Sequence, residues 1–294
     1  MRKYLAGLAL AGSVLLTAVG CGSKEAAKEE TGAKETKAEE IKEETGFSGN
    51  ISTNGSTSME KVIGVLSEQF QMTYPDVTIT YDATGSGTGI EAVINKTTDI
   101  GLASRALKDE EKEKGLVETT VALDGIAIIV NENNPIEDLK IEDIKKIYTK
   151  EMASWSDIEG GKDGDISCIG REAGSGTRDG FESITDTKDA CKLAQELTST
   201  GAVIESVKNS EQAIGYASFA AVENQKGIKV VTVNGVECNA ENIADGSYLV
   251  QRPFNLITAK DGKLSAQAQG FFDFMLSEDA KGLIESAGAV YVGK

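Results

Sequence analysis

The chain has 294 residues, carries 30 Lys and Arg against 47 Asp and Glu, and contains no histidine. Its length leaves room for two packed cores, because single cores stop growing at about 250 residues, and its net charge of −17 excludes an electrostatic hold on nucleic acid. Without histidine, Ser-His-Asp and Cys-His catalysis and the HExxH zinc site are excluded, which leaves carboxylate, lysine or metal-carboxylate chemistry, or binding without chemistry.

Residues 1–20 have the pattern of an export signal, since Arg2 and Lys3 precede an apolar stretch that ends before Cys21. A transmembrane anchor is the alternative, but a span needs about 20 predominantly apolar residues, and this stretch contains three glycines. The segment 18–21, Ala-Val-Gly-Cys, resembles a lipobox, although Ala18 departs from the usual leucine. We therefore interpret residues 1–20 as a lipoprotein signal peptide and Cys21 as the site of lipidation.

Residues 22–45 contain five lysines, eight glutamates, no aromatic residue and one large aliphatic residue, Ile41. Such a segment cannot bury enough apolar area to offset the entropy of ordering it. We expect residues 21–46 to form a lipidated cysteine followed by a charged, flexible tether.

From Phe47 onward, short β-rich runs alternate with helical stretches, which is typical of an α/β fold. The run at 122–131 is continuously apolar, as expected of a strand covered on both faces. Strands are predicted at residues 77–81, 100–104, 122–131, 166–170, 213–217, 228–233 and 256–259. Helices are predicted at residues 58–74, 89–96, 141–149, 177–184, 188–197 and 265–276.

Three loops mix glycine with hydroxyl residues directly before a helical pattern, at residues 54–60, 85–91 and 171–178. In the first two, Thr57 and Thr88 each precede a glutamate by the capping-box spacing. Glycine lets the backbone approach a ligand, and a helix start offers unpaired N–H donors and partial positive charge, so each loop is a candidate anion site. Ordinary caps and turns are the alternative for any one loop.

The third loop adds Arg171, four residues before a Ser-Gly-Thr triplet. Its planar guanidinium suits a tetrahedral oxyanion. Neither a GxxxxGK[ST] loop nor a strand-GxGxxG-helix pattern is present, so a bare oxyanion fits better than a nucleotide.

The cysteines Cys168, Cys191 and Cys238 lack CxxC spacing, and the carboxylates near residue 165 lack EF-hand order, so we expect no metal site. One disulfide together with one buried thiol stays open as an alternative.

Eight segments, in order along the chain, resemble the phosphate-binding lipoproteins of phosphate ABC importers, the PstS family. They are NGSTSMEKV, YDATGSGTGIEAV, DIGLASRALKDEE, DGIAIIVN, IYTKEMASWSDI, REAGSGTRDGFE, AIGYASFA and SYLVQRPFNLIT. The resemblance implies a two-lobed α/β clamp of the periplasmic-binding-protein type II, or Venus-flytrap, architecture, with crossing strands between the lobes. Residues 47–125 and 254–294 would form lobe 1, and residues 126–253 would form lobe 2.

Carried over by motif, the resemblance implies phosphate donors from both lobes. They are Ser56, Thr57, Ser58, Ser86, Arg171, Ser175, Gly176 and Thr177. The better-known branch of the family has a carboxylate, which accepts the phosphate proton, where this chain has Arg105. Asp124 is our candidate replacement, with an Asp-Gly turn or an ion pair with Arg105 as the alternative. Ser104 and Arg105 are further candidates for direct contact with the ligand.

The resemblance implies a monomeric, lipid-anchored protein on the outer face of the cell membrane of a Gram-positive bacterium. It would deliver inorganic phosphate to an ABC permease, with no cofactor, no nucleic-acid partner and no covalent chemistry. Alternatives are a binding protein for sulfate, arsenate or molybdate, a phosphate-ester hydrolase with an Asp or Ser nucleophile, and a sensor or adhesion lipoprotein with a vestigial clamp. We interpret Trp155 as a packing residue and Arg252 as a member of a structural ion pair.

Overall fold

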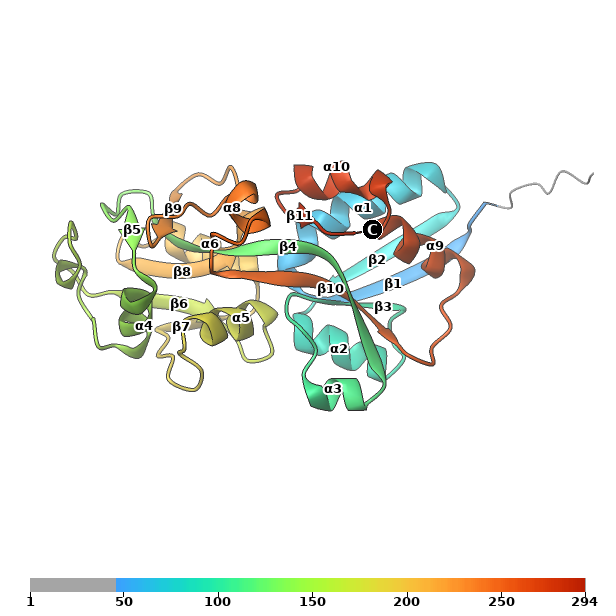
Figure 1. Ribbon diagram of the computed structural model, residues 1–294, viewed down its shortest axis with the longest axis horizontal. Helices are drawn as coiled ribbons and strands as arrows, with labels where there is room; N and C mark the ends of the chain where they lie inside the picture. Colours follow the sequence, from blue (N-terminus) through green and yellow to red (C-terminus); the bar gives the residue numbers. More distant parts are fainter. Residues whose placement is uncertain (1–45, 294) are drawn as a thin grey trace, which may run out of the picture. The chain divides into compact units, whose positions relative to one another are not determined.

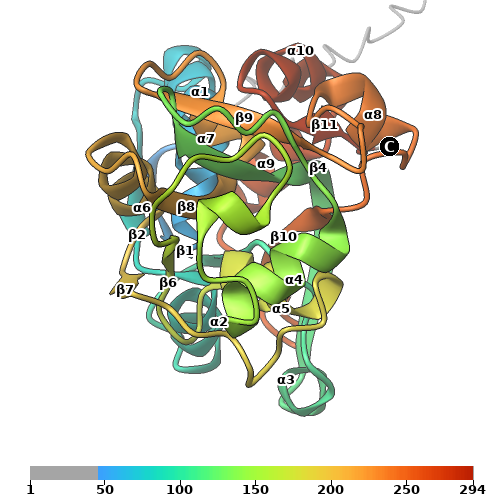
Figure 2. The same ribbon diagram turned by 90° about the vertical axis from the view of Figure 1, so that its left-hand side faces the viewer.

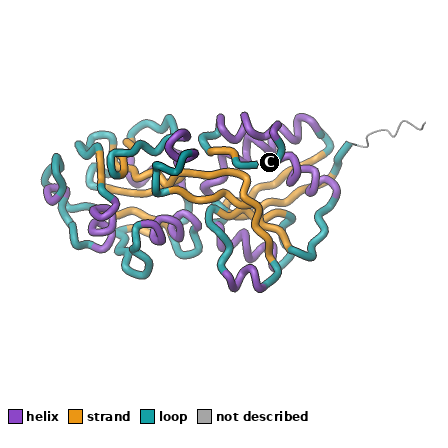
Figure 3. Tube along the Cα trace, viewed as in Figure 1, coloured by secondary structure: helices purple, strands orange, loops and turns teal. Residues whose placement is uncertain are grey.

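A computed structural model describes residues 46–293, so the predicted signal peptide, the Cys21 lipidation site and all but the last residue of the predicted tether lie outside the described residues. Within this range, eleven strands form a mixed sheet with helices packed around it (Figures 1 and 3). The strands are β1 Gly49–Gly55, β2 Val77–Ala83, β3 Ile100–Ala103, β4 Leu116–Asn131, β5 Asp138–Leu139, β6 Ser167–Arg171, β7 Gln195–Leu197, β8 Ala213–Ser218, β9 Ile228–Val233, β10 Gln251–Ala259 and β11 Val290–Tyr291.

The helices connect strands of the sheet or follow its last long strand. They are α1 Glu60–Thr73, α2 Ser86–Ile94, α3 Asp109–Glu113, α4 Ile141–Thr149, α5 Gly176–Ile184, α6 Thr200–Lys208, α7 Phe219–Val222, α8 Ala240–Ala244, α9 Ala266–Met275 and α10 Glu278–Ser286, with short 3-10 turns at η1 Thr57–Met59 and η2 Trp155–Asp157.

The fold has two lobes, and β4 belongs to both of them. Its first part pairs antiparallel with β10, from Leu116 to Gly125. Its second part pairs with β8 and β9, from Ile126 onward. Figure 1 shows β4 and β10 running side by side through the junction. The two lobes are therefore joined by continuous sheet backbone.

Each lobe has its own hydrophobic core. Lobe 1 contains β1 to β3, and its core includes Ile51, Phe70 and Phe271. Figure 1 shows α1, α9 and α10 on one side of these strands and α2 with α3 on the other. Lobe 2 contains β6 to β9, and its core includes Tyr148 and Phe181. Figure 2 faces lobe 2 and shows α4 in front, with α6 and α8 on opposite flanks.

The predicted strands are all present, and the long apolar run at 122–131 lies within β4, where all of it except Leu123 is buried. The helix predicted at 188–197 is wrong, and the elements that the sequence did not predict are β1, β5, β7, β11, α3, α6, α7, α8 and α10. The backbone of residues 188–197 instead bonds to distant parts of the chain: Lys192 N–H donates to Tyr148 O, and Ala194 N–H donates to Cys168 O. Residues Gln195–Leu197 then pair in parallel with β6.

Several smaller interpretations are settled by burial and bonding. Trp155 is confirmed as a packing residue, since it is 2% exposed and its indole N–H donates to Gln212 O. The cysteines Cys168, Cys191 and Cys238 are free thiols, so the disulfide left open by the sequence is not formed. Between residues 46 and 293, no group of three or more acidic or Cys side chains is placed to hold a metal ion. None of the helices in that range is long and apolar enough to cross a membrane.

Candidate functional site

Buried hydroxyl side chains from the two lobes meet where four helical segments begin. We call this set the hydroxyl cluster, and its members are Ser56, Thr57, Ser58, Ser86, Ser104, Thr177 and Thr200, each at most 5% exposed. Ser58 Oγ lies 2.8 Å from Thr177 Oγ1, and Thr57 Oγ1 lies 3.0 Å from Thr200 Oγ1. Both contacts join lobe 1 to lobe 2. The cluster is therefore an interface of polar groups between two separate cores.

A second branch of the hydroxyl cluster lies within lobe 1 and touches the start of α5. Ser56 Oγ donates to Ser104 Oγ at 2.8 Å, and Ser86 Oγ lies 3.2 Å from the same atom. A Cβ added at Gly176 would lie 2.5 Å from Ser86 Oγ and 2.7 Å from Ser104 Oγ. Only glycine at this position lets α5 approach the lobe 1 hydroxyls so closely.

The start of the first helix explains why the Thr57 hydroxyl is free to cross between the lobes. The strand β1 ends at Gly55, whose φ of +145° and contact with the Leu102 carbonyl leave no room for a side chain. Ser56 is then the N-cap, and its side chain accepts from Ser58 N–H. The capping box predicted at Thr57 is therefore wrong, and so is the one at Thr88, because α2 begins earlier, at Ser86.

Arg171 supplies the positive charge of the site. Its Nη1 donates to Thr57 Oγ1 at 2.9 Å and to Thr200 Oγ1 at 3.3 Å. Its Nε and Nη2 donate to the two oxygens of Glu172, at 3.0 and 2.8 Å, and to the carbonyls of Leu197 and Thr198. Because two of its nitrogens are held in this way, the buried guanidinium presents its third nitrogen to the hydroxyl cluster.

Helix starts add backbone donors to the same place. The first four N–H groups of a helix have no partner inside the helix, and they carry partial positive charge. The helix α2 begins at Ser86, α5 at Gly176 and α6 at Thr200, all beside the hydroxyl cluster. Ser175 is buried and caps α5 by accepting from Arg178 N–H. Hydroxyls, N–H groups and one guanidinium together make a site suited to a small anion.

Thr200 is a site residue that sequence reasoning missed. It follows Ser199, the N-cap of α6, whose side chain accepts from Ala202 N–H. The local sequence Ser-Thr-Gly before a helix has the same design as the other three loops. The helix predicted at 188–197 and the lack of a predicted helix at 200–208 hide this pattern in the sequence.

The carboxylate of Asp124 lies at the junction of the lobes and already has donors on both oxygens. Its Oδ1 accepts from Ser218 Oγ at 2.8 Å and from Ala220 N–H at 3.3 Å. Its Oδ2 accepts from Arg252 Nη2 at 3.0 Å, across the β4–β10 pair. Burial raises the pKa of Asp124, while the Arg252 charge and these hydrogen bonds oppose that shift. The interpretation of Arg252 as an ion-pair residue is confirmed, and the alternative pair of Asp124 with Arg105 is wrong.

Arg105 turns its side chain toward carboxylates instead of the hydroxyl cluster. Its Nη1 and Nη2 donate to the two oxygens of Glu111, at 2.8 and 2.7 Å. Its Nε lies 2.9 Å from Asp179 Oδ2. Of the two further candidates, Ser104 belongs to the hydroxyl cluster, whereas Arg105 has its described contacts elsewhere.

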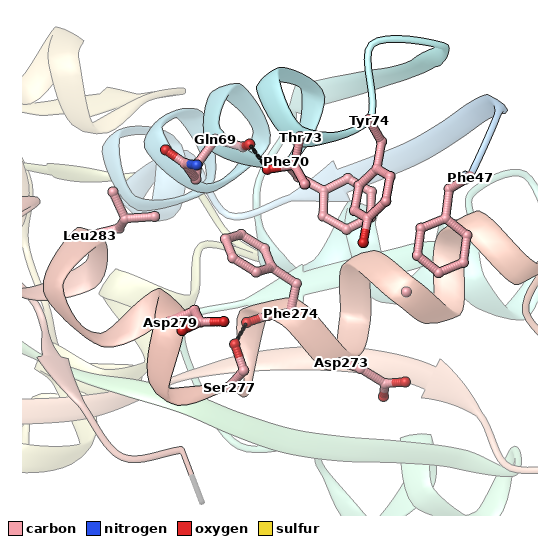
Figure 4. A pocket seen from close by; sticks show the side chains of 11 residues that line it. Phe47, Gln69, Phe70, Thr73, Tyr74, Asp273, Phe274, Ser277, Asp279 and Leu283 are labelled. Atoms are coloured by element: carbon pink, nitrogen blue, oxygen red, sulfur yellow. Dashed lines mark hydrogen bonds between the residues drawn. The ribbon is translucent and has the colours of Figure 1, made fainter. Parts of the chain in front are cut away.

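A separate groove of about 740 Å³ lies between α1 and the α9–α10 region (Figure 4). Aromatic rings line it, and its polar lining includes two carboxylates and, among the described residues, no basic side chain. The lining residues are Phe47, Gln69, Phe70, Thr73, Tyr74, Gly270, Asp273, Phe274, Ser277, Asp279 and Leu283. An anion has no favourable partner there, so the hydroxyl cluster is the better candidate site.

Comparison with known proteins gives a consistent result. A profile described as "PBP superfamily domain" matches residues 26–279. The chain is 30% identical to the phosphate-binding protein PstS of Bacillus subtilis over 99% of this chain and 95% of that protein, and 33% identical to the one of Staphylococcus saprophyticus over 84% and 81%.

A solved structure shares the fold. It is a putative phosphate ABC transporter substrate-binding protein with bound phosphate from Clostridium perfringens, and its TM-score is 0.79 at 38% identity. The match covers 83% of this chain and 100% of that one. With the motifs, the two-lobed fold and these relatives in agreement, the chain belongs to the PstS family of phosphate-binding proteins, within the PBP superfamily.

Proposed function

We propose that this protein captures inorganic phosphate between its lobes and delivers it to the permease of an ABC importer. The observation that carries the proposal is the meeting of buried hydroxyls from both lobes around Arg171. Relatives named as phosphate-binding proteins, and a related structure with bound phosphate, support this choice of ligand. The protein binds and releases its ligand without covalent chemistry.

The proposed ligand contacts come from the hydroxyl cluster, Arg171 and the start of α5. They are Ser56, Thr57, Ser58, Ser86, Ser104, Arg171, Ser175, Gly176, Thr177 and Thr200. A hydroxyl both donates and accepts, so a phosphate oxygen with or without its proton finds a partner. A ligand that contacts both lobes at once favours the closed arrangement, because it binds that arrangement more tightly than the open one.

We further propose the domain boundaries given by the motifs, with lobe 1 at 47–125 and 254–294 and lobe 2 at 126–253. The change of partner strands in β4 between Gly125 and Ile126 supports them. Export, lipidation at Cys21 and the outer face of the membrane as location are further parts of the proposal, supported by the lipobox-like segment of the sequence. A monomeric state completes it.

A second candidate is a protein that accepts other tetrahedral oxyanions, sulfate among them. One observation favours it: the described contacts bring no carboxylate into the hydroxyl cluster, since Glu172 is bound to Arg171 and Asp124 to Arg252. A carboxylate acceptor rejects fully ionised sulfate by leaving a negative charge unpaired. The hydroxyl cluster contains no such carboxylate, so it cannot reject sulfate in this way.

Thermal unfolding with added phosphate or sulfate tests both candidates. A ligand that binds only the folded chain stabilises it by RT ln(1 + [L]/Kd), about 2.7 kcal/mol at 100 times Kd. We expect phosphate to raise the Tm of the wild type and not that of Arg171→Ala. Lys145→Ala is the control, because this side chain on α4 is 42% exposed, and it should respond like the wild type. No shift with phosphate would reject the proposal, and equal shifts with both anions would favour the second candidate.

A further inference from the structure

Arg105 is fixed firmly on lobe 1, directly after the hydroxyl-cluster member Ser104. Glu111 of α3 binds two of its guanidinium nitrogens. Its backbone carbonyl accepts from Asn255 Nδ2 of β10, at 3.1 Å. With 7% of its surface exposed, Arg105 is a buried cation whose position is set before any contact with lobe 2.

The remaining guanidinium nitrogen faces the opposite lobe. Nε of Arg105 lies 2.9 Å from Oδ2 of Asp179, which is on the first turn of α5, two residues after Thr177. Both atoms are shielded from solvent, and neither has an aligned hydrogen-bond partner among the described residues. The contact is therefore mainly a Coulomb attraction. Lys108 Nζ, 3.9 Å from the same oxygen, adds a second positive charge.

A second ion pair also joins the lobes but is much more exposed. Lys61 of α1 lies 3.5 Å from Glu223, which follows α7, and their side chains are 41% and 38% exposed. The Arg105 side chain is 8% exposed and that of Asp179 is 33% exposed. Solvent and salt screen the Lys61–Glu223 pair more strongly, so the Arg105–Asp179 pair has the larger effect on closure.

We infer that Arg105 is a positioning residue that slows ligand release: through Asp179 it holds the start of α5 against the Ser104 segment when the lobes are closed. This inference rests on the proposed function. The pair does not touch the ligand. It forms only when Ser104 and Thr177 are close enough to enclose one, so it lowers the free energy of the closed arrangement and leaves the encounter with ligand unchanged.

Stopped-flow kinetics with inorganic phosphate measure association and release separately. We expect Asp179→Asn to raise the release rate about fivefold, the scale of a partly shielded ion pair, with association unchanged. Asp179→Glu, which keeps the charge, should recover part of the loss. Glu223→Gln, at the exposed pair, is the matched control and should change release by less than about twofold.

A double-mutant cycle with Arg105→Gln identifies the partner of Asp179. We expect the effects of Arg105→Gln and Asp179→Asn on release to be non-additive, because either change breaks the same contact. Added sodium chloride should speed release from the wild type and have less effect on Asp179→Asn. Additive effects, or a release rate in Asp179→Asn equal to that of the wild type, would overturn the inference. If the wild type itself shows no phosphate binding, the proposed function fails instead.

Discussion

Asp124→Asn removes a negative charge from the place where the two lobes join. Asp124 is 0% exposed and Arg252 4% exposed, with 3.0 Å between their charged groups. The amide oxygen can still accept from Ser218 and Ala220, but the Arg252 charge is left buried without a counter-charge. Breaking a buried ion pair in this way costs about 3–5 kcal/mol. At about 2–4 °C per kcal/mol for a chain of this size, the Tm should fall by about 6–20 °C.

Thermal unfolding followed by circular dichroism in phosphate-free buffer measures this loss. Asp186→Asn is the matched control, because it removes the same charge from a pair with Lys145 in which the Asp186 side chain is 88% exposed. The control should have nearly the same Tm as the wild type. A Tm for Asp124→Asn within about 2 °C of the wild type would refute the reasoning from burial.

The same variant decides whether Asp124 accepts the phosphate proton, a role that stays a prediction. If Asp124 is the acceptor, calorimetry of Asp124→Asn should show weaker phosphate binding and new sulfate binding. If Asp124 serves only the junction, the preference between the two anions should match that of the wild type. The two roles therefore separate in selectivity, whatever the change in stability.

Two further predictions concern the hydroxyl cluster and the Arg105 site. Thr200→Val keeps the shape of the side chain but removes one hydroxyl. Calorimetry should show phosphate affinity falling about 5- to 30-fold, because one lost hydrogen bond costs about 1–2 kcal/mol. Thr73→Val, at an exposed position, is the control and should leave the phosphate affinity unchanged. Burial raises the pKa of Glu111, but hydrogen bonds from Arg105 and Lys108 and their charges outweigh it and hold the pKa below its ordinary value. A carboxyl with a lowered folded pKa stabilises the fold above its unfolded pKa and loses that effect as the pH falls through the folded value. The stability advantage of the wild type over Glu111→Gln should be full at pH 7 and shrink below about pH 4 in urea unfolding; equal differences at both pH values would contradict the pairing.

The sequence predicted the site loops better than it predicted the contacts between them. The loops around Ser58, Ser86 and Arg171 were found because glycine and hydroxyl residues before a helix have a local meaning. The use of Thr57 as a partner of Thr200 was not found, because that contact depends on how two lobes meet. Local capping rules predict that the Thr57 hydroxyl caps its own helix. In the structure this hydroxyl instead contacts Thr200 of the other lobe.

The same limit explains why the alternative pairing of Asp124 with Arg105 and the helix predicted at 188–197 are wrong. The partners of Arg105 are Glu111, six positions along, and Asp179, on another lobe, and no local pattern links the latter to it. Residues 188–197 have composition compatible with a helix, yet Tyr148 and Cys168 provide carbonyl acceptors that fix part of the segment outside a helix. In both cases distant parts of the chain outweigh local preference.

The position of β10 in the sheet has a consequence for the order of folding. In lobe 1, β10 pairs with β3 through Ile257 and Gly101, and α9 and α10, which cover that lobe, come later still in the chain. The sheet of lobe 1 therefore stays incomplete until β10, at Gln251–Ala259, has been synthesised. Pairings so distant in sequence form slowly. Until then β3 lacks its antiparallel neighbour β10, so lobe 1 completes its sheet later than the early position of β1 to β3 in the chain would suggest.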